Sequence, residues 1–172
     1  MSDIKFLLKS DNADNDTNFT DSSGNNVIQK NGGVKHSVEK NKKNLLFNTS
    51  VIKFNGTDSY LRSDTALDWH ASVNSNFYME CLVYETPNTL NTFRTIFSIN
   101  QINNGNNIYS LGLKSPDNDL LIKYNGTDIT TSSIIKKEQW YHIIVTYINN
   151  VLNTYVNGLL VNTNNTTLNT PL

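Results

Sequence analysis

Apolar and polar positions alternate in short runs along the whole chain. The clearest run, residues 139–161 (QWYHIIVTYINNVLNTYVNGLLV), is rich in aromatic and β-branched residues and is interrupted twice. The interruptions, Asn149-Asn150 and Asn157-Gly158, are pairs that tolerate the positive φ of tight hairpin turns. The pattern therefore predicts a three-stranded antiparallel meander, with strands at 140–147, 151–156 and 159–162.

The rest of the chain follows the same pattern. No segment repeats apolar residues at the helical spacing of about 3.6, and turn residues recur at short intervals. We therefore expect one all-β domain of 172 residues, a sandwich or a barrel. Further strands are predicted at residues 4–8, 26–30, 34–38, 60–62, 77–86, 93–99, 108–114 and 120–124, and residues 45–54 are predicted to form one longer strand or a pair of strands.

Charge and composition exclude several classes of protein. The net charge is −1, so no field attracts nucleic acid or anionic lipid. No apolar run approaches the roughly 18 residues that a membrane span needs, and the start, MSDIKFLLKSDN, does not read as a secretory signal. The single cysteine, Cys81, allows no intrachain disulfide, and its alternation with Met79 and Val83 predicts a position in the core.

Five motifs in order along the chain carry a resemblance to a known family. They are FTDSSGNN, IKFNGTDSYLRS, NFYMECLVYETP, TFRTIFSI and QWYHIIVTYINNVLNTYVNGLLV. From about residue 3 to residue 162, the chain resembles the laminin-G-type domains of the concanavalin A-like lectin and glucanase superfamily. The resemblance implies an antiparallel two-sheet jelly roll over residues 1–172, with Trp140 in the core and His142 in a structural role.

One departure from the family pattern bears on assembly. Family members close with a further strand that pairs beside the N-terminal strand, whereas this chain continues as VNTNNTTLNTPL. Either residues 166–172 form a short substitute or another chain supplies the strand. Because an uncovered edge recruits a partner through main-chain hydrogen bonds, we expect a homo-oligomer or a complex with another protein. Its predicted assembly edge consists of Ile4, Phe6 and Leu8.

The carboxylates argue against an enzyme. The related jelly-roll glycosidases use two carboxylates on one strand, both facing the cleft. Glu80 takes the family's strand position, but Glu85 points to the opposite face by alternation, so no second carboxylate has the right spacing. We therefore expect Glu80 to be paired with a neighbour rather than catalytic, and Arg94 on the next strand is the candidate partner.

Sugar binding requires an aromatic ring to stack on the sugar and polar groups to orient it. Trp69, in ALDWHAS, is the candidate ring, although it could instead anchor a crossover loop. The predicted glycan site consists of Trp69, His70, Tyr84 and Arg94.

The Asp-rich loop is a second candidate site. Asp14, Asp16 and Asn18 follow the spacing of the first ligands of an EF-hand calcium loop. Phe19 replaces the required glycine, however, and Asn25 stands where the closing glutamate belongs. The loop is therefore either a calcium site or a solvated polar loop, and no other cofactor is expected.

The setting follows from the family and from the start of the chain. Laminin-G-type domains are usually exported, yet no signal is recognised here, and virion proteins need none. The first hypothesis is therefore a virion decoration or fibre-type protein that contacts virion partners or itself and meets host-surface glycans. The alternative is a carbohydrate-binding, lectin-like domain of a larger secreted protein. An endoglycosidase is disfavoured by the carboxylates.

Overall fold

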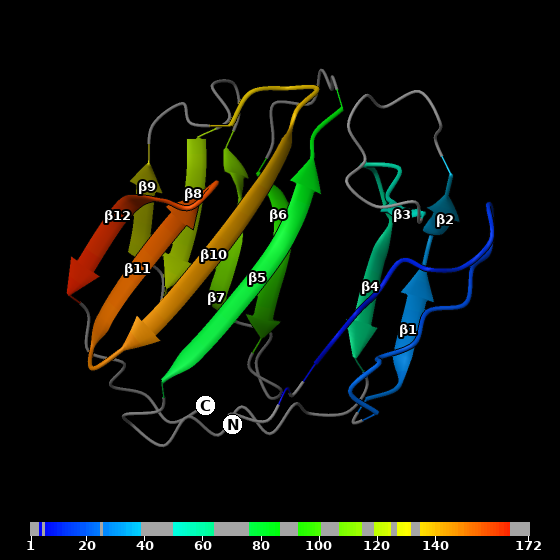
Figure 1. Cartoon of the computed structure of the whole chain (residues 1–172), viewed down its shortest axis with the longest axis horizontal. Coiled ribbons are helices and arrows are strands. Elements are labelled where there is room, and N and C mark those ends of the chain that lie inside the picture. The colour runs from blue at the N-terminus through cyan, green and yellow to red at the C-terminus, as the bar shows by residue number, and fades with distance from the viewer. Residues whose placement is uncertain are drawn as a thin grey trace. The chain divides into compact units, whose positions relative to one another are not determined.

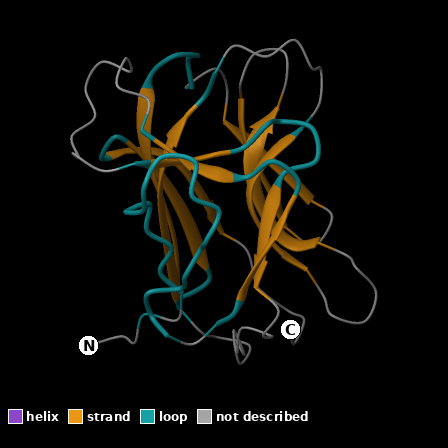
Figure 2. Cartoon of the chain, turned by 90° about the vertical axis from the view of Figure 1, so that its right-hand side faces the viewer, coloured by secondary structure: helices purple, strands orange, loops and turns teal. Residues whose placement is uncertain are grey.

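The structure is a computed structural model, which describes residues 4, 6–24, 26–38, 50–63, 76–86, 93–100, 107–114, 119–124, 127–131 and 135–165. Within these ranges the chain forms strands and loops (Figure 2). The described residues include no helix long and apolar enough to cross a membrane. The chain divides into two units, residues 1–68 and 69–172, so the single domain stays a prediction.

The second unit contains two four-stranded antiparallel sheets. One has the order β12-β11-β10-β5 and the other the order β6-β7-β8-β9. Figure 1 shows the first in front of the second, and we call them the front sheet and the back sheet. Their strands are β5 (Phe77–Tyr84), β6 (Arg94–Asn100), β7 (Asn107–Lys114), β8 (Asp119–Tyr124), β9 (Thr127–Thr131), β10 (Trp140–Ile148), β11 (Val151–Val156) and β12 (Leu159–Asn165).

The core of this unit lies between the two sheets, because each strand turns every second side chain inward. Phe77 of β5 stacks on Tyr147 of β10, with ring centroids 5.5 Å apart, and meets the edge of Tyr109 of β7. Cys81 packs against the same core, as predicted, and burial raises the pKa of its thiol to about 11. The expected two-sheet sandwich is confirmed. Among the described residues, the buried side chains that pack together in this core are Tyr109, Leu111, Leu113, Leu120, Ile122, Ile135, Tyr141, Ile143, Val145, Tyr147, Leu152 and Val156.

The predicted meander is confirmed with small changes at its ends. Asn149, Asn150 and Asn157 have φ of 51°, 65° and 50°, and Gly158 has 81°, as the two tight turns require. Strand β12 continues three residues past the predicted end, to Asn165. Strand β9 was not predicted, because its sequence, TDITT, has a single aliphatic residue to mark a buried face.

In the described residues of the first unit, the strands form two short pairs. Strand β1 (Ile28–Asn31) pairs with β4 (Tyr60–Ser63), and β2 (Lys35–Ser37) pairs with β3 (Val51–Lys53), all antiparallel. Gly32, with φ of 63°, makes the turn between β1 and β2. The strands predicted at 26–30, 34–38 and 60–62 are therefore present within a residue or two. The one predicted at 45–54 is present in part as β3, and its first half, residues 45–49, lies outside the described residues.

The strand predicted at residues 4–8 is wrong for the positions that the structure describes. Leu8 forms an isolated bridge with Asp21, and the neighbouring Leu7 N–H donates to the Asp21 carboxylate at 2.7 Å. The Asp21 side chain thus accepts the hydrogen bond of a backbone N–H that a strand would have donated to a neighbouring strand. The predicted assembly edge at Ile4, Phe6 and Leu8 loses the strand on which it rested. The homo-oligomer stays a prediction, and residues 166–172 lie outside the described residues.

Asp21 connects residues 7, 23 and 26 of the first unit through hydrogen bonds. Its buried carboxylate accepts hydrogen bonds from the Leu7 N–H, from the N–H and hydroxyl of Ser23, and from the side-chain amide of Asn26. Burial alone would raise the pKa of Asp21, but these bonds outweigh it and hold the pKa well below its ordinary value. The stability that they contribute is present at neutral pH and is lost as the pH falls through the lowered pKa.

A substitution at Gly112 of β7 can test the packing of the second unit. A Cβ at this position would lie closer than 3.0 Å to the Arg94 carbonyl oxygen and to the Phe93 ring. We expect Gly112→Ala to lower the free energy of unfolding by about 2 kcal/mol, because the added methyl group would force the backbone at Arg94 to shift. Urea denaturation measures the change. Gly33→Ala is the control, since its Cβ would first meet Asn55 at 3.5 Å, and equal losses in both variants would contradict this packing.

Candidate binding face of the front sheet

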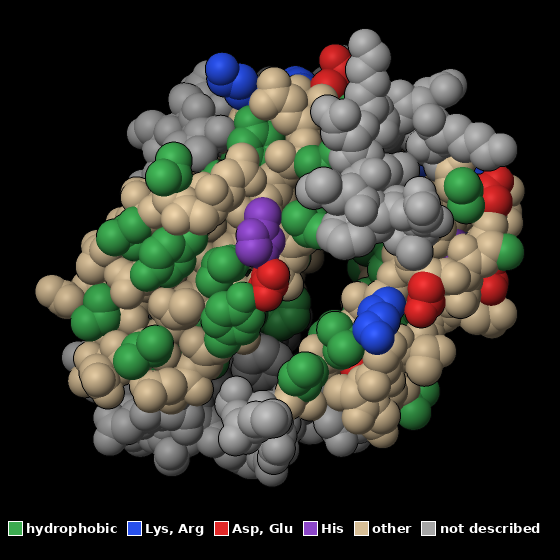
Figure 3. All heavy atoms as spheres, viewed as in Figure 1, with side chains coloured by type: hydrophobic (Ala, Val, Ile, Leu, Met, Phe, Trp, Pro, Cys, Tyr) green, Lys and Arg blue, Asp and Glu red, His purple; other side chains and the backbone are tan. Residues whose placement is uncertain are grey.

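The strands of the front sheet turn their remaining side chains away from the core, and we call this the outer face. In β5 the exposed and half-buried positions alternate, so Tyr78, Glu80 and Leu82 point outward. Tyr78 is 57% exposed and Leu82 is 47% exposed. In the view of Figure 3, hydrophobic side chains gather over this sheet, with a histidine and an acidic side chain among them. The other outer residues include Tyr84, Trp140, His142, Ile144, Thr146, Asn153, Tyr155 and Leu160.

The strand register aligns these side chains in rows across the sheet. In one row Glu80 lies opposite Ile144, Ile144 lies opposite Tyr155, and Tyr155 lies opposite Leu160. Since neighbouring strands are about 4.8 Å apart, the apolar part of this row extends about 14 Å from the β5 backbone. The row is thus polar at one end and apolar along the rest.

An aromatic pair lies at the end of the face where β5 ends and β10 begins. Tyr84 and Trp140 are opposite each other in the register, and their ring centroids are 5.3 Å apart with planes tilted by 54°. The prediction that Trp140 belongs to the core is wrong. The core side of β10 belongs to Tyr141 and every second residue after it, which leaves Trp140 half-buried on the outer face.

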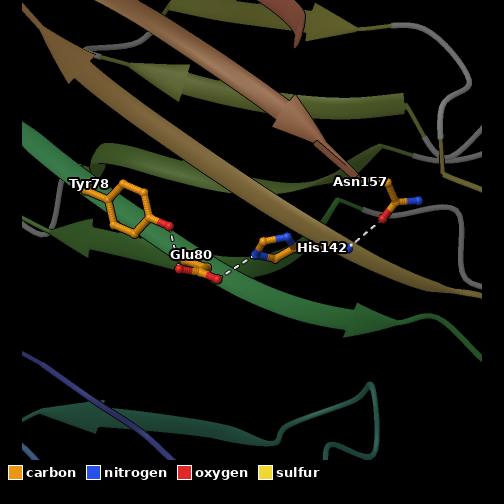
Figure 4. A network of polar contacts seen from close by, with 4 residues as sticks. All are labelled: Tyr78, Glu80, His142 and Asn157. Carbon is orange, nitrogen blue, oxygen red and sulfur yellow. Dashed lines mark hydrogen bonds and ion pairs between the residues drawn. The ribbon is translucent and has the colours of Figure 1, made fainter. Parts of the chain in front are cut away.

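A polar cluster lies on β5, the last strand in the order of the front sheet, and on the neighbouring β10 (Figure 4). The Tyr78 hydroxyl donates to Glu80 Oε2, and His142 Nε2 lies 2.6 Å from Glu80 Oε1. The His142 main chain is held in turn, because its N–H donates to Asn157 Oδ1 at 2.9 Å. Glu80 is therefore paired, as expected, but its partners are Tyr78 and His142. The expectation that Arg94 would be the partner is wrong.

These contacts set the charge of the cluster. The hydrogen bond from Tyr78 and the contact with His142 lower the pKa of Glu80, against a smaller opposing effect of burial. The same hydrogen bond raises the pKa of Tyr78 to about 12. At neutral pH Glu80 is thus ionised and Tyr78 is protonated. Because an ionised carboxylate can only accept, Nε2 is the protonated nitrogen of His142.

Arg94 makes a different ion pair. Its Nη2 lies 2.7 Å from Glu85 Oε1, and the Glu85 side chain is only 6% exposed. Glu85 is buried, in agreement with the prediction that it points away from the face of Glu80. The pair joins the end of β5 to the start of β6, so it links the front sheet to the back sheet.

The predicted glycan residues are thus not gathered at one place in the described structure. Tyr84 lies on the outer face, while the guanidinium of Arg94 is bound to Glu85. Trp69 and His70 lie outside the described residues. Sequence reasoning missed Trp140 and Tyr155 as outer residues. The signal for Trp140 was its spacing from the two polar residues of its strand, His142 and Thr146. Both are an even number of residues away, so all three side chains lie on the same face.

The Asp-rich loop is held by its own hydrogen bonds. Asp14 accepts from the Val38 N–H at 2.9 Å, and Asp16 accepts from the Asn18 N–H at 2.9 Å. Phe19, at the position where an EF-hand needs glycine, stacks on the buried His36 with centroids 4.7 Å apart. No group of three His, Cys, Asp or Glu residues able to hold a metal occurs in the part of the chain that the structure describes. Calcium at Asp14, Asp16 and Asn18 stays a prediction.

Comparison with known proteins identifies the family. A family model described as the concanavalin A-like lectin/glucanases superfamily matches residues 55–172. The chain belongs to this superfamily. Its antiparallel two-sheet sandwich is the jelly roll of that family, as the sequence motifs predicted. No curated protein matches the chain.

Two solved structures are similar to the chain. Domain 4 of AbnA, a GH43 extracellular arabinanase from Geobacillus stearothermophilus in complex with arabinotriose, has a TM-score of 0.55 and 20% identity, over 88% of this chain and 70% of that one. An S-layer domain-containing protein from Clostridium thermocellum ATCC 27405 has a TM-score of 0.47 and 21% identity, over 94% of this chain and 72% of that one. At such identities the likeness to the arabinanase domain concerns the fold.

The polar cluster can be tested by titration. In the wild type the Glu80 carboxyl should titrate below the ordinary range of glutamate, and Tyr78→Phe should raise its pKa, because the largest stabilising hydrogen bond is lost. Carbon-detected NMR of the side-chain carboxyls measures both values. Tyr60→Phe, an exposed tyrosine of the first unit, is the control. An unchanged Glu80 pKa in Tyr78→Phe would contradict this arrangement.

Proposed function

We propose that the chain is a non-catalytic carbohydrate-binding module and that its ligand lies across the outer face of the front sheet. The observation that carries this proposal is the combination of aromatic rings with one polar cluster on the same face. Sugars present C–H faces that stack on rings and hydroxyl edges that need hydrogen bonds. Tyr155, in the row of Glu80, and the pair Tyr84 and Trp140, at the end of the face, offer rings on the same face as Glu80 and His142. The superfamily, and a similar domain solved with arabinotriose, support a sugar as ligand.

The carboxylates support binding without hydrolysis. Glycosidases of the usual kind hold two carboxyl groups about 5 to 9.5 Å apart across the scissile bond. Glu80 is the only carboxylate on the four strands of the front sheet. Glu85, just beyond β5, is buried and bound to Arg94, so it is not available as a second catalytic group.

The setting remains a separate question from the binding face. An extracellular location is supported by the similar domain of an extracellular arabinanase. The virion hypothesis, a decoration or fibre-type protein that meets host glycans, stays a prediction and would use the same face. Mass spectrometry of purified particles and of the secreted fraction distinguishes the two settings.

The binding face predicts which aromatic residues matter. Trp140→Ala and Tyr155→Ala should each weaken glycan binding by about 1 kcal/mol, roughly fivefold, because each removes a stacking surface. Affinity electrophoresis against a panel of polysaccharides, followed by calorimetry, measures the change.

Ser98→Ala is the matched control, since Ser98 is exposed on β6 in the back sheet. Trp69→Ala belongs in the same series, because Trp69 is the ring predicted from the sequence. Full binding by Trp140→Ala and Tyr155→Ala together with a loss in Trp69→Ala would move the site away from the outer face.

Absence of hydrolysis is the second functional prediction. We expect no release of reducing ends from β-glucan, arabinan, agarose or carrageenan, because Glu80 has no carboxylate partner. A reducing-sugar assay with wild type and Glu80→Gln, over several hours, makes the measurement. Activity that disappears in Glu80→Gln would show an enzyme and would overturn this part of the proposal.

A further inference from the structure

The outer face is nearly free of charged side chains. Strands β5, β10, β11 and β12 contain no lysine, arginine or aspartate, and Glu80 is their single carboxylate. The titratable side chains in contact with Glu80 are Tyr78 on its own strand and His142 on β10. On β11 the only titratable side chain of the outer face is Tyr155. A ligand on this face therefore meets one negative charge, and no cation of these strands other than a protonated His142.

The hydrogen-bonding capacity of the cluster is one-sided. The proton of the Tyr78 hydroxyl and the Nε2 proton of His142 are both directed at Glu80. What the cluster can still offer is acceptors, namely the remaining lone pairs of the carboxylate, the phenolic oxygen of Tyr78 and Nδ1 of neutral His142. A ligand that binds here must donate hydrogen bonds. Hydroxyl groups donate, whereas carboxylate, sulfate and phosphate groups accept and are repelled by Glu80.

The row through Glu80 adds a shape requirement. Beside Glu80 the same row continues as Ile144, Tyr155 and Leu160, which present an apolar strip. A pyranose or furanose ring that lies along the row can place its C–H face on this strip and its hydroxyl edge at Glu80. A neutral sugar meets both requirements, because it combines an apolar face with hydroxyl donors and carries no anionic group.

We infer that the outer face selects neutral glycans and that Glu80, held by Tyr78 and His142, is the specificity-determining residue that accepts hydrogen bonds from two neighbouring sugar hydroxyls. This inference rests on the proposed function and names the ligand class for the same face. Glu80 acts as an acceptor fixed in advance by its two partners, so little side-chain entropy is lost when a sugar binds. Acidic polysaccharides are excluded by the same carboxylate.

The test compares neutral, anionic and cationic polysaccharides. Wild type, Glu80→Gln and Ser98→Ala are measured by affinity electrophoresis and calorimetry against neutral arabinan, galactan and β-glucan, against anionic polygalacturonate and carrageenan, and against cationic chitosan. We expect a neutral glycan to bind and the anionic ones to be bound at least tenfold more weakly. Glu80→Gln should weaken neutral binding about tenfold, because a charge-assisted acceptor becomes a neutral amide, and Ser98→Ala should bind as wild type.

A pH series on the wild type gives a second readout that needs no variant. Binding should be lost as Glu80 becomes protonated, below the ordinary range of glutamate, because the carboxylate then loses the charge that strengthens its hydrogen bonds to the sugar. If circular dichroism shows that Glu80→Gln does not fold, the pH profile of the wild type and its binding to neutral, anionic and cationic polysaccharides still test the inference.

The outcomes separate this inference from the function on which it rests. Stronger binding of an anionic glycan, or of chitosan alone, overturns the selection of neutral glycans but leaves a carbohydrate-binding module. Equal affinity of folded Glu80→Gln and wild type overturns the role of Glu80. If no polysaccharide binds, the proposed function fails, and the inference fails with it.

Discussion

The alternation of side chains along β10 is the constraint on which the rest of the second unit depends. This strand lies inside the front sheet, paired with β5 on one side and β11 on the other, so its register decides that of its neighbours. Tyr141, Ile143, Val145 and Tyr147 fill the core, with Ile143, Val145 and Tyr147 fully buried. The intervening positions then have to form the outer face. One strand thus sets both the packing that holds the sheets together and the surface that can meet a ligand.

Tight turns keep that register in place. A shift of one residue would bring His142 and Thr146 into the core and move Ile143 and Val145 to solvent. The turn at Asn149 and Asn150 has both residues at positive φ, which suits a two-residue hairpin and leaves little freedom for another pairing. Asn157 strengthens the other end, because its N–H and its side chain both bond to the main chain of His142. The turns therefore also position the histidine of the polar cluster.

Local patterns made most of the second unit predictable, and long-range contacts account for what could not be predicted. The meander followed from aromatic and β-branched runs between Asn-rich turns, and five of its strand ends lie within one residue of the prediction. The residues of β10 are nearly all apolar, however, so composition alone did not tell inward from outward positions, and Trp140 was misplaced. The partners of Glu80 depended on which strand lies beside β5. That strand is β10, more than fifty residues further along the chain, and not β6 with its Arg94.

The state of Cys81 makes the packing of the second unit independent of the redox potential of its surroundings. The thiolate is the form that reacts with oxidants and disulfides, and burial against the core raises the pKa of this thiol to about 11. Almost no thiolate is therefore present at neutral pH, and the sequence has no second cysteine with which it could pair. The second unit owes its cohesion to apolar packing between two sheets, and that packing is the same in a reducing cytosol and in an oxidising extracellular medium.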